Sequence, residues 1–166
     1  MRSHRLVRAA AAVAVALTAG ACGAAQGPPA TPPSAVPPTI KASYMRQFKA
    51  DVITDSAGFA LYVFQPDHGQ RVTCKNSCAV IWPPVFMSPN QRAAAGPGVQ
   101  PSLLGSDLYS SGRSVVTYNG WPLYTYVSDT TAGVAAGQGL NLNGGYWYVI
   151  RPDGTVIVPP GDPPAT

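Results

Sequence analysis

The sequence predicts an all-β fold: a small antiparallel β domain built from two pseudo-repeats, carried on an exported N-terminal segment. Apolar residues come in short runs rich in Val, Ile, Tyr, Phe and Trp, separated by turn residues, which is typical of strands. All seven acidic residues are Asp, and long amphipathic helices usually carry Glu. A seven-residue pattern occurs twice, 62 residues apart, which indicates an internal repeat. The length of 166 residues fits one domain.

The N-terminus predicts export and lipid anchoring. Basic, then apolar, then small residues fill positions 1–21 in the order of a signal peptide. Its apolar part, 9–21, is 13 residues long, short of the roughly 20 that span a bilayer as a helix. Gly20 and Ala21 are small enough for a signal peptidase that cleaves before a lipid-modified cysteine. We therefore expect lipidation at Cys22 and an extracytoplasmic protein anchored to a bacterial membrane; ordinary cleavage without an anchor is the alternative.

Composition divides the rest of the chain into a tether, a domain and a tail. Residues 22–42 hold the lipidated cysteine and a linker rich in Pro and Ala, which favours an extended, disordered chain. The tail 159–166 has the same character and is also expected to be disordered. The β domain is expected over 43–158.

Within the domain, the pattern of apolar and turn residues predicts six strands. A short helix is expected within 74–81, and 87–113 reads as a long irregular loop. Asn119-Gly120 predicts a tight turn, and the Pro-Asp-Gly sequence at 152–154 predicts a hairpin. The predicted strands are 51–54, 59–65, 114–118, 122–128, 146–151 and 155–158.

The repeated pattern is Leu-Tyr-x-(Phe/Tyr)-x-x-Asp, at 61–67 and 123–129, and each copy is followed by a Trp. This predicts two similar β units, about 50–85 and 114–158. The aromatic residues of each copy stand two apart and therefore share one face of a strand. They are expected in the core, with a ligand-stacking surface as the alternative, and the two Asp are expected to accept hydrogen bonds from turn N–H groups. The motif residues are Tyr62, Phe64, Asp67, Trp82, Tyr124, Tyr126, Asp129 and Trp147.

At these residues the chain resembles a family of secreted-repeat bacterial lipoproteins that carry a Tyr-x-(Phe/Trp/Tyr)-x-x-Asp motif. The resemblance covers about 51–154 and implies an exported, often lipid-anchored β domain. It brings no established activity, ligand or catalytic residue. The segments that carry it are 61–67, 74–84, 118–124 with Asp129, 137–139 and 144–147.

The cysteines predict one disulfide. If Cys22 carries lipid, Cys74 and Cys78 remain as an even pair in an oxidising compartment. Their spacing of four brings them close on a helical turn. The alternative is a copper-binding or thiol-redox site, with His68 as a further ligand of Cu(I).

Charge and motif content favour a binding protein over an enzyme. The net charge is +4, but three of the eleven basic residues lie in the signal, which leaves eight against seven acidic residues and no basic stripe for nucleic acid. A serine hydrolase elbow, a phosphate loop and a multi-histidine metal site are absent from the sequence. We expect no catalytic residue and no cofactor, and a structural or partner-binding role toward a wall component or protein, through exposed aromatics or the long loop.

Overall fold

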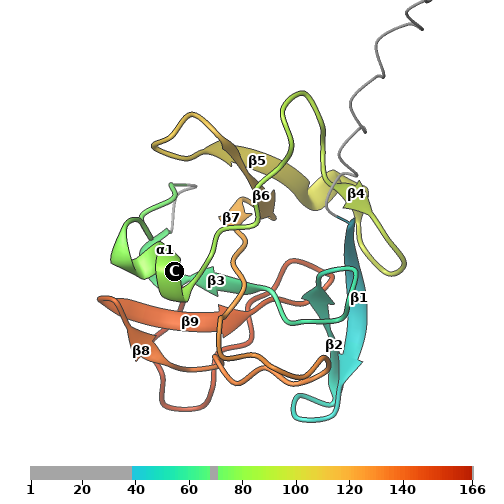
Figure 1. Cartoon of the computed structure of the whole chain (residues 1–166). Coiled ribbons are helices and arrows are strands. Elements are labelled where there is room, and N and C mark those ends of the chain that lie inside the picture. The colour runs from blue at the N-terminus through green and yellow to red at the C-terminus, as the bar shows by residue number, and fades with distance from the viewer. Residues whose placement is uncertain (1–38, 68–70, 166) are drawn as a thin grey trace, which may run out of the picture. The chain divides into compact units, whose positions relative to one another are not determined.

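The computed structural model describes residues 39–67 and 71–165. The predicted signal peptide, the lipidation site Cys22, most of the linker, and His68 lie outside the described residues. In the described part the regular structure is mostly strand, arranged in three small sheets with one short α-helix (Figure 1). The all-β prediction is confirmed. The same residues include no helix with the length and apolar character needed to cross a membrane.

The first sheet begins earlier than predicted. Strand β1 (Thr39–Met45) pairs antiparallel with β2 (Ala50–Thr54), and its first two residues pair parallel with β4 (Ala94–Ala95). The side chain of Ile40 is fully buried. The predicted start at residue 43 was therefore wrong, because an apolar residue next to the proline-rich segment joins the core, and the sheet is not purely antiparallel.

The other two sheets bring together strands that are distant in the sequence. The second has the order β3-β9-β8 and the third β5-β6-β7, with antiparallel neighbours throughout. Two 3₁₀ turns, η1 and η2, follow β3 and precede β5. The bounds are β3 (Tyr62–Phe64), β5 (Leu104–Leu108), β6 (Ser114–Tyr118), β7 (Trp121–Pro122), β8 (Asn141–Leu142), β9 (Gly145–Val149), α1 (Ser77–Ile81), η1 (Gln65–Asp67) and η2 (Pro101–Leu103).

The predicted turns are confirmed. Asn119 and Gly120 both have positive φ, 48° and 81°, and connect β6 to β7, as a two-residue hairpin turn requires. Arg151 and Thr155 close the Pro-Asp-Gly hairpin through Arg151 N–H to the Thr155 carbonyl at 2.8 Å. The helix within 74–81 is also confirmed, as α1.

The expected loop 87–113 contains regular structure. It holds β4, η2 and the five-residue strand β5, which pairs along its whole length with β6. None of the side chains of β5 is fully buried, so this edge strand lacks the apolar alternation by which a strand is recognised in a sequence. The prediction of an irregular loop was wrong for this part.

The core lies on both faces of β3. Tyr62 and Phe64 face one cluster of buried side chains, and Leu61 and Val63 face the other. This is the alternation predicted for the first motif copy. In the second copy, Tyr124 belongs to the first of these clusters and Leu123 to the second.

The C-terminal tail packs onto the domain, contrary to the prediction of disorder. Tyr148 Oη donates to the Pro163 carbonyl at 2.9 Å, and Gln65 Nε2 donates to the Pro164 carbonyl at 2.8 Å. Ala165 is buried. Proline has no N–H, but its carbonyl still accepts, and the tail is held through these acceptors.

Candidate functional site

The two motif copies meet directly at their first tyrosines. The backbone N–H of Tyr62 donates to the carbonyl of Tyr124 at 2.8 Å, and the N–H of Tyr124 donates to the carbonyl of Tyr62 at 2.9 Å. This reciprocal pair forms an isolated antiparallel bridge. The motif residues of both copies are consequently placed around one point.

Each motif tyrosine bonds to the aspartate of the other copy. Tyr62 Oη donates to Asp129 Oδ2 at 2.7 Å, and Tyr124 Oη donates to Asp67 Oδ2. Each aspartate also accepts a backbone N–H, Asp67 from Thr73 at 2.8 Å and Asp129 from Ala136 at 2.9 Å. These last bonds are those expected from the sequence, whereas the exchanged Tyr–Asp pairs were not predicted.

The motif aromatics form a continuous stack around the two tryptophans. The rings of Trp82 and Trp147 are stacked, with centroids 3.9 Å apart and planes 3° apart. Phe64 stacks on the outer face of Trp147 at 4.2 Å, and Tyr126 stacks on Trp82 at 4.1 Å. Tyr62 meets Trp82 edge-on at 5.3 Å, and the equivalent contact of Tyr124 with Trp147 is 5.1 Å. We call the eight motif residues, which include the four stacked rings, the motif cluster.

The motif cluster is core. Its tyrosine, phenylalanine and tryptophan side chains are buried, except Tyr126, which is half-buried like Asp129. A ligand therefore has no open ring face at Trp82 or Trp147. Gly137 closes the cluster further, because a Cβ at this position would lie 2.7 Å from the Trp82 ring and 3.0 Å from the Tyr62 ring.

Burial sets the protonation of the Tyr–Asp pairs. Desolvation raises the pKa of Asp67, and hydrogen bonds from Thr73 and Tyr124 oppose the rise. Desolvation likewise raises the pKa of Asp129 against the bond from Tyr62. The pKa of both tyrosines is also raised, first by burial and also by the neighbouring carboxylate. Both phenols therefore stay protonated donors, and the pairs act as buried hydrogen bonds within the core.

The two cysteines form a disulfide at the start of α1. Cys74 and Cys78 are bonded, with Cα atoms 5.3 Å apart, and both are buried. The predicted disulfide is confirmed. In this state neither sulfur is a thiolate, the form that binds soft metals.

A groove lies away from the motif cluster, between residues 86–92 and the β5–β6 hairpin. Its cavity volume is about 770 Å³, and its walls include Ser106 on β5 and residues 112–114 at the start of β6. A second cavity of about 400 Å³ adjoins it, since both are lined by Met87, Arg92 and Ser106. Two backbone bonds fix the floor, Met87 N–H to the Ser114 carbonyl and Val116 N–H to the Val85 carbonyl.

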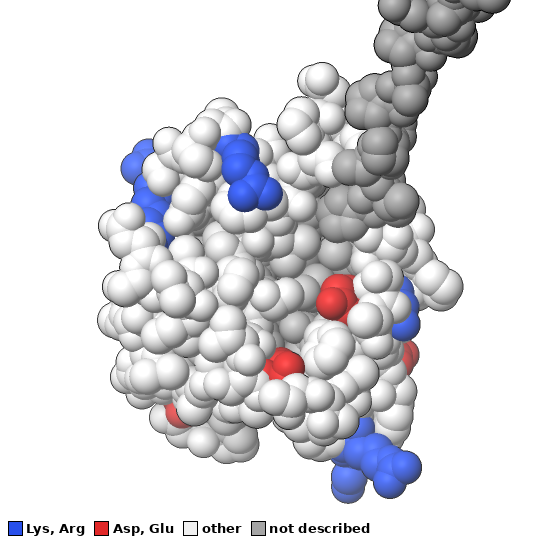
Figure 2. Space-filling view, in the orientation of Figure 1, with Lys and Arg blue, Asp and Glu red and all other residues white. Residues whose placement is uncertain are grey.

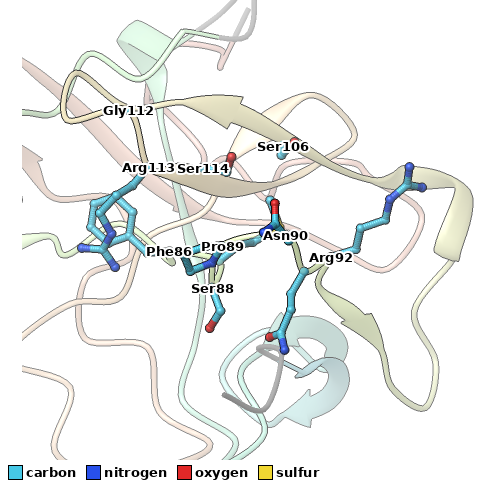
Figure 3. A pocket seen from close by; sticks show the side chains of 11 residues that line it. Phe86, Ser88, Pro89, Asn90, Arg92, Ser106, Gly112, Arg113 and Ser114 are labelled. Carbon is cyan, nitrogen blue, oxygen red and sulfur yellow. The ribbon is translucent and has the colours of Figure 1, made fainter. Parts of the chain in front are cut away.

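The groove is polar and carries two arginines. Figure 3 shows Arg113 and Phe86 at one end and Arg92 at the other, with Asn90 and Ser106 between them. The Arg113 guanidinium lies 3.6 Å from the centre of the Phe86 ring. By contrast, most of the surface seen in Figure 2 carries neither a basic nor an acidic side chain. The sequence placed the long loop among candidate binding regions but did not identify these side chains, which share no local pattern.

Residues 108–151 match a protein family described as a secreted repeat of unknown function. The family resemblance predicted from the sequence is confirmed over this segment. No curated protein and no solved structure matched the chain.

The matched segment includes the second motif copy, Trp147, and strands β6 to β9. Of the groove lining, residues 112–114 lie inside the matched segment, whereas Ser106 and residues 86–92 lie outside it. A secreted family agrees with the extracytoplasmic location that the signal peptide predicts. The equivalence of 50–85 with this repeat stays a prediction.

Proposed function

We infer that the protein is a cell-envelope lipoprotein whose β domain binds an envelope component in the groove between residues 86–92 and the β5–β6 hairpin. It performs no catalysis. The observation that carries this proposal is the groove itself, a cavity of about 770 Å³ lined by donors and acceptors in a domain whose motif side chains are otherwise occupied. Concave sites with a few convergent polar groups are where ligands usually bind.

The anchoring part of the proposal rests on the sequence. The predicted signal peptide, 1–21, ends directly before Cys22, and a diacylated cysteine provides enough buried hydrocarbon for stable attachment. The attached domain then faces the wall or periplasm, where its partner is a wall component or another envelope protein.

The non-enzymatic part rests on the state of the reactive side chains. Asp67 and Asp129 are each committed to a tyrosine and a backbone N–H, and the cysteines are bonded to each other. No carboxylate lines the groove among the described residues. A hydroxyl nucleophile needs a neighbouring general base. Among the described residues, the lining of the groove offers none to its serine hydroxyls.

The copper or thiol-redox alternative, with Cys74, Cys78 and His68, requires reduction of the disulfide. Both sulfurs are buried in the core cluster that contains Trp82. No observation on the described residues favours this alternative, and we propose binding without a cofactor.

The groove proposal is tested with insoluble cell-wall sacculi. The full chain with Cys22→Ser is incubated with purified sacculi and the bound fraction is measured after sedimentation. Ser106→Trp fills the groove without changing its charge, and Ser110→Trp adds the same side chain at an exposed position of the hairpin that does not line the groove. We expect binding that Ser106→Trp abolishes and Ser110→Trp preserves. Binding that both variants retain would place the site elsewhere.

A further inference from the structure

We propose that the groove recognises an anionic, hydroxyl-rich chain, a polyol or sugar polymer that carries phosphate or carboxylate groups. This inference deepens the proposed function and rests on it. The observations are the charge of the groove, the way Arg113 is held, and the neutral polar side chains of the lining.

The charge of the lining is entirely positive. Arg92 and Arg113 are its only charged side chains among the described residues, and neither makes an ion pair within them. The nearest acidic residue in the hairpin, Asp107, follows Ser106 on β5 and so points to the opposite face. There its carboxylate accepts the N–H of Val72 at 3.0 Å. An anion in the groove consequently meets two uncompensated guanidinium groups and no carboxylate.

Arg113 is positioned for an anion by its aromatic support. Its guanidinium carbon lies 3.6 Å from the centre of the Phe86 ring, and Phe86 in turn meets Tyr109 edge-on at 5.3 Å. A guanidinium that stacks on a ring keeps its N–H donors in its own plane, directed outward. These donors fit the two oxygens of a phosphate or carboxylate. The stack therefore reduces the freedom that Arg113 would lose on binding.

The neutral side chains of the groove supply the second half of the recognition. Besides the two arginines, the lining includes the side chains of Asn90, Ser106 and Ser114. Hydroxyl and amide groups both donate and accept hydrogen bonds. Phosphate and carboxylate groups only accept at neutral pH, whereas a ligand hydroxyl also donates. A ligand that carries both kinds of group therefore fits this lining better than an anion alone.

The size of the groove favours a chain over a single ion. The second cavity continues past Arg92 along Ala93 and Leu104, and the two cavities share three lining residues. Arg92 and Arg113 lie at opposite ends of the first cavity (Figure 3). Successive anionic groups of a polymer can occupy the two ends while the hydroxyls between them reach the amide and serine side chains.

The inference is tested by isothermal titration of the full Cys22→Ser chain with defined polymers. Poly(glycerol phosphate) carries hydroxyls and phosphates, and polygalacturonate carries hydroxyls and carboxylates. Comparing the two shows which anionic group is preferred. Polyphosphate carries charge alone and dextran carries hydroxyls alone. We expect at least one of the first two to bind at least about tenfold more tightly than polyphosphate and dextran. Equal binding of polyphosphate, or of dextran, overturns the inference.

Variants then locate the interaction. Loss of one charge-assisted bond weakens binding by about tenfold or more, so Arg92→Gln and Arg113→Gln should each do so. Arg113→Lys should bind as weakly as Arg113→Gln, because the lysine ammonium lacks the planar fork of N–H donors that a guanidinium has. Arg46→Gln removes the same charge from an exposed position outside the groove and should bind like the parent protein. An equal loss in Arg46→Gln would reveal nonspecific charge attraction and contradict the proposal.

If sacculus binding depends on Ser106 but neither mixed polymer binds, only the ligand class is wrong. If sacculus binding is itself absent, the proposed function is wrong.

Discussion

At the scale of single residues, each motif aspartate is held by a tyrosine hydroxyl and a backbone N–H. Asp67 is fully buried, and its carboxylate accepts from Tyr124 and from Thr73. Because burial raises the pKa of Asp67, the native state binds this proton more tightly than the unfolded state does. Its contribution to stability is therefore fully present below the ordinary pKa of Asp and is lost as pH rises through the raised native pKa.

The first prediction concerns this pH dependence. Tyr124→Phe removes a donor that stabilises the ionised carboxylate, so the pKa of Asp67 rises further. We expect the variant to lose about 1.5–3 kcal/mol of unfolding free energy at pH 7, and less near pH 4, measured by urea denaturation. Tyr148→Phe is the matched control, because the Tyr148 hydroxyl donates to the Pro163 carbonyl, which does not titrate. A loss for Tyr124→Phe that is the same at both pH values would contradict the account.

The second prediction compares the two tryptophans. Trp147 Nε1 donates to the Leu142 carbonyl at 3.1 Å, whereas Trp82 Nε1 is buried without a partner in the described residues. Phenylalanine at either position keeps a ring in the stack. We expect Trp82→Phe to cost about 1 kcal/mol less unfolding free energy than Trp147→Phe. Equal costs in denaturant titrations would show that the indole N–H groups have the same environment.

At the scale of elements, local patterns explain what could be predicted. Strands β2, β3, β6 and β9 contain β-branched and aromatic side chains that are mostly buried, and the sequence indicated each of them. The exposed strand β5 has no β-branched residue and escaped prediction. The tail escaped because its composition is that of a disordered segment, while its attachment depends on carbonyls that accept from Tyr148 and Gln65.

The same reasoning applies to the two candidate sites. The motif cluster could be predicted because its residues recur at a fixed spacing and because aromatic side chains are usually buried. The pairing of each tyrosine with the other copy's aspartate required the fold. The groove could not be predicted from the sequence, because Arg92 and Arg113 lie 21 positions apart with no shared pattern. They line one groove only through the pairing of β5 with β6 and the backbone bond between Met87 and Ser114.

The third prediction concerns the disulfide. Helix α1 is five residues long, too short to be stable alone, and the Cys74–Cys78 bond holds its start. Replacing both cysteines by serine should lower the unfolding free energy by about 2 kcal/mol and leave the far-UV circular dichroism unchanged. Reduction of the parent protein should give the same loss. Two reactive thiols in the native protein before reduction would contradict the disulfide.

At the scale of the whole molecule, the described domain is closed at its centre by the motif cluster and has a groove on its surface. The interlocking of the two motif copies leaves the centre of the domain without an accessible reactive group among the described residues. Binding is therefore expected at the surface, where side chains from the loop and the β5–β6 hairpin converge.

The fourth prediction concerns attachment to the membrane. If Cys22 carries the lipid, Cys22→Ser removes the hydrocarbon that we expect to hold the protein in the bilayer. We expect the variant in the soluble extracytoplasmic fraction and the parent in the membrane fraction, measured by immunoblotting after detergent-free washing. A variant that stays with the membrane would show a different mode of attachment.

The most direct test of the central claim is to locate the binding site by nuclear magnetic resonance. Soluble fragments of digested cell wall are titrated into ¹⁵N-labelled Cys22→Ser protein, and amide shifts are followed. The account predicts saturating shifts in residues 86–92, at Ser106 and in residues 112–114, with the motif cluster unaffected. Shifts that gather instead at Tyr126, Val127 and Asp129, which line a separate cavity beside the motif cluster, would contradict it.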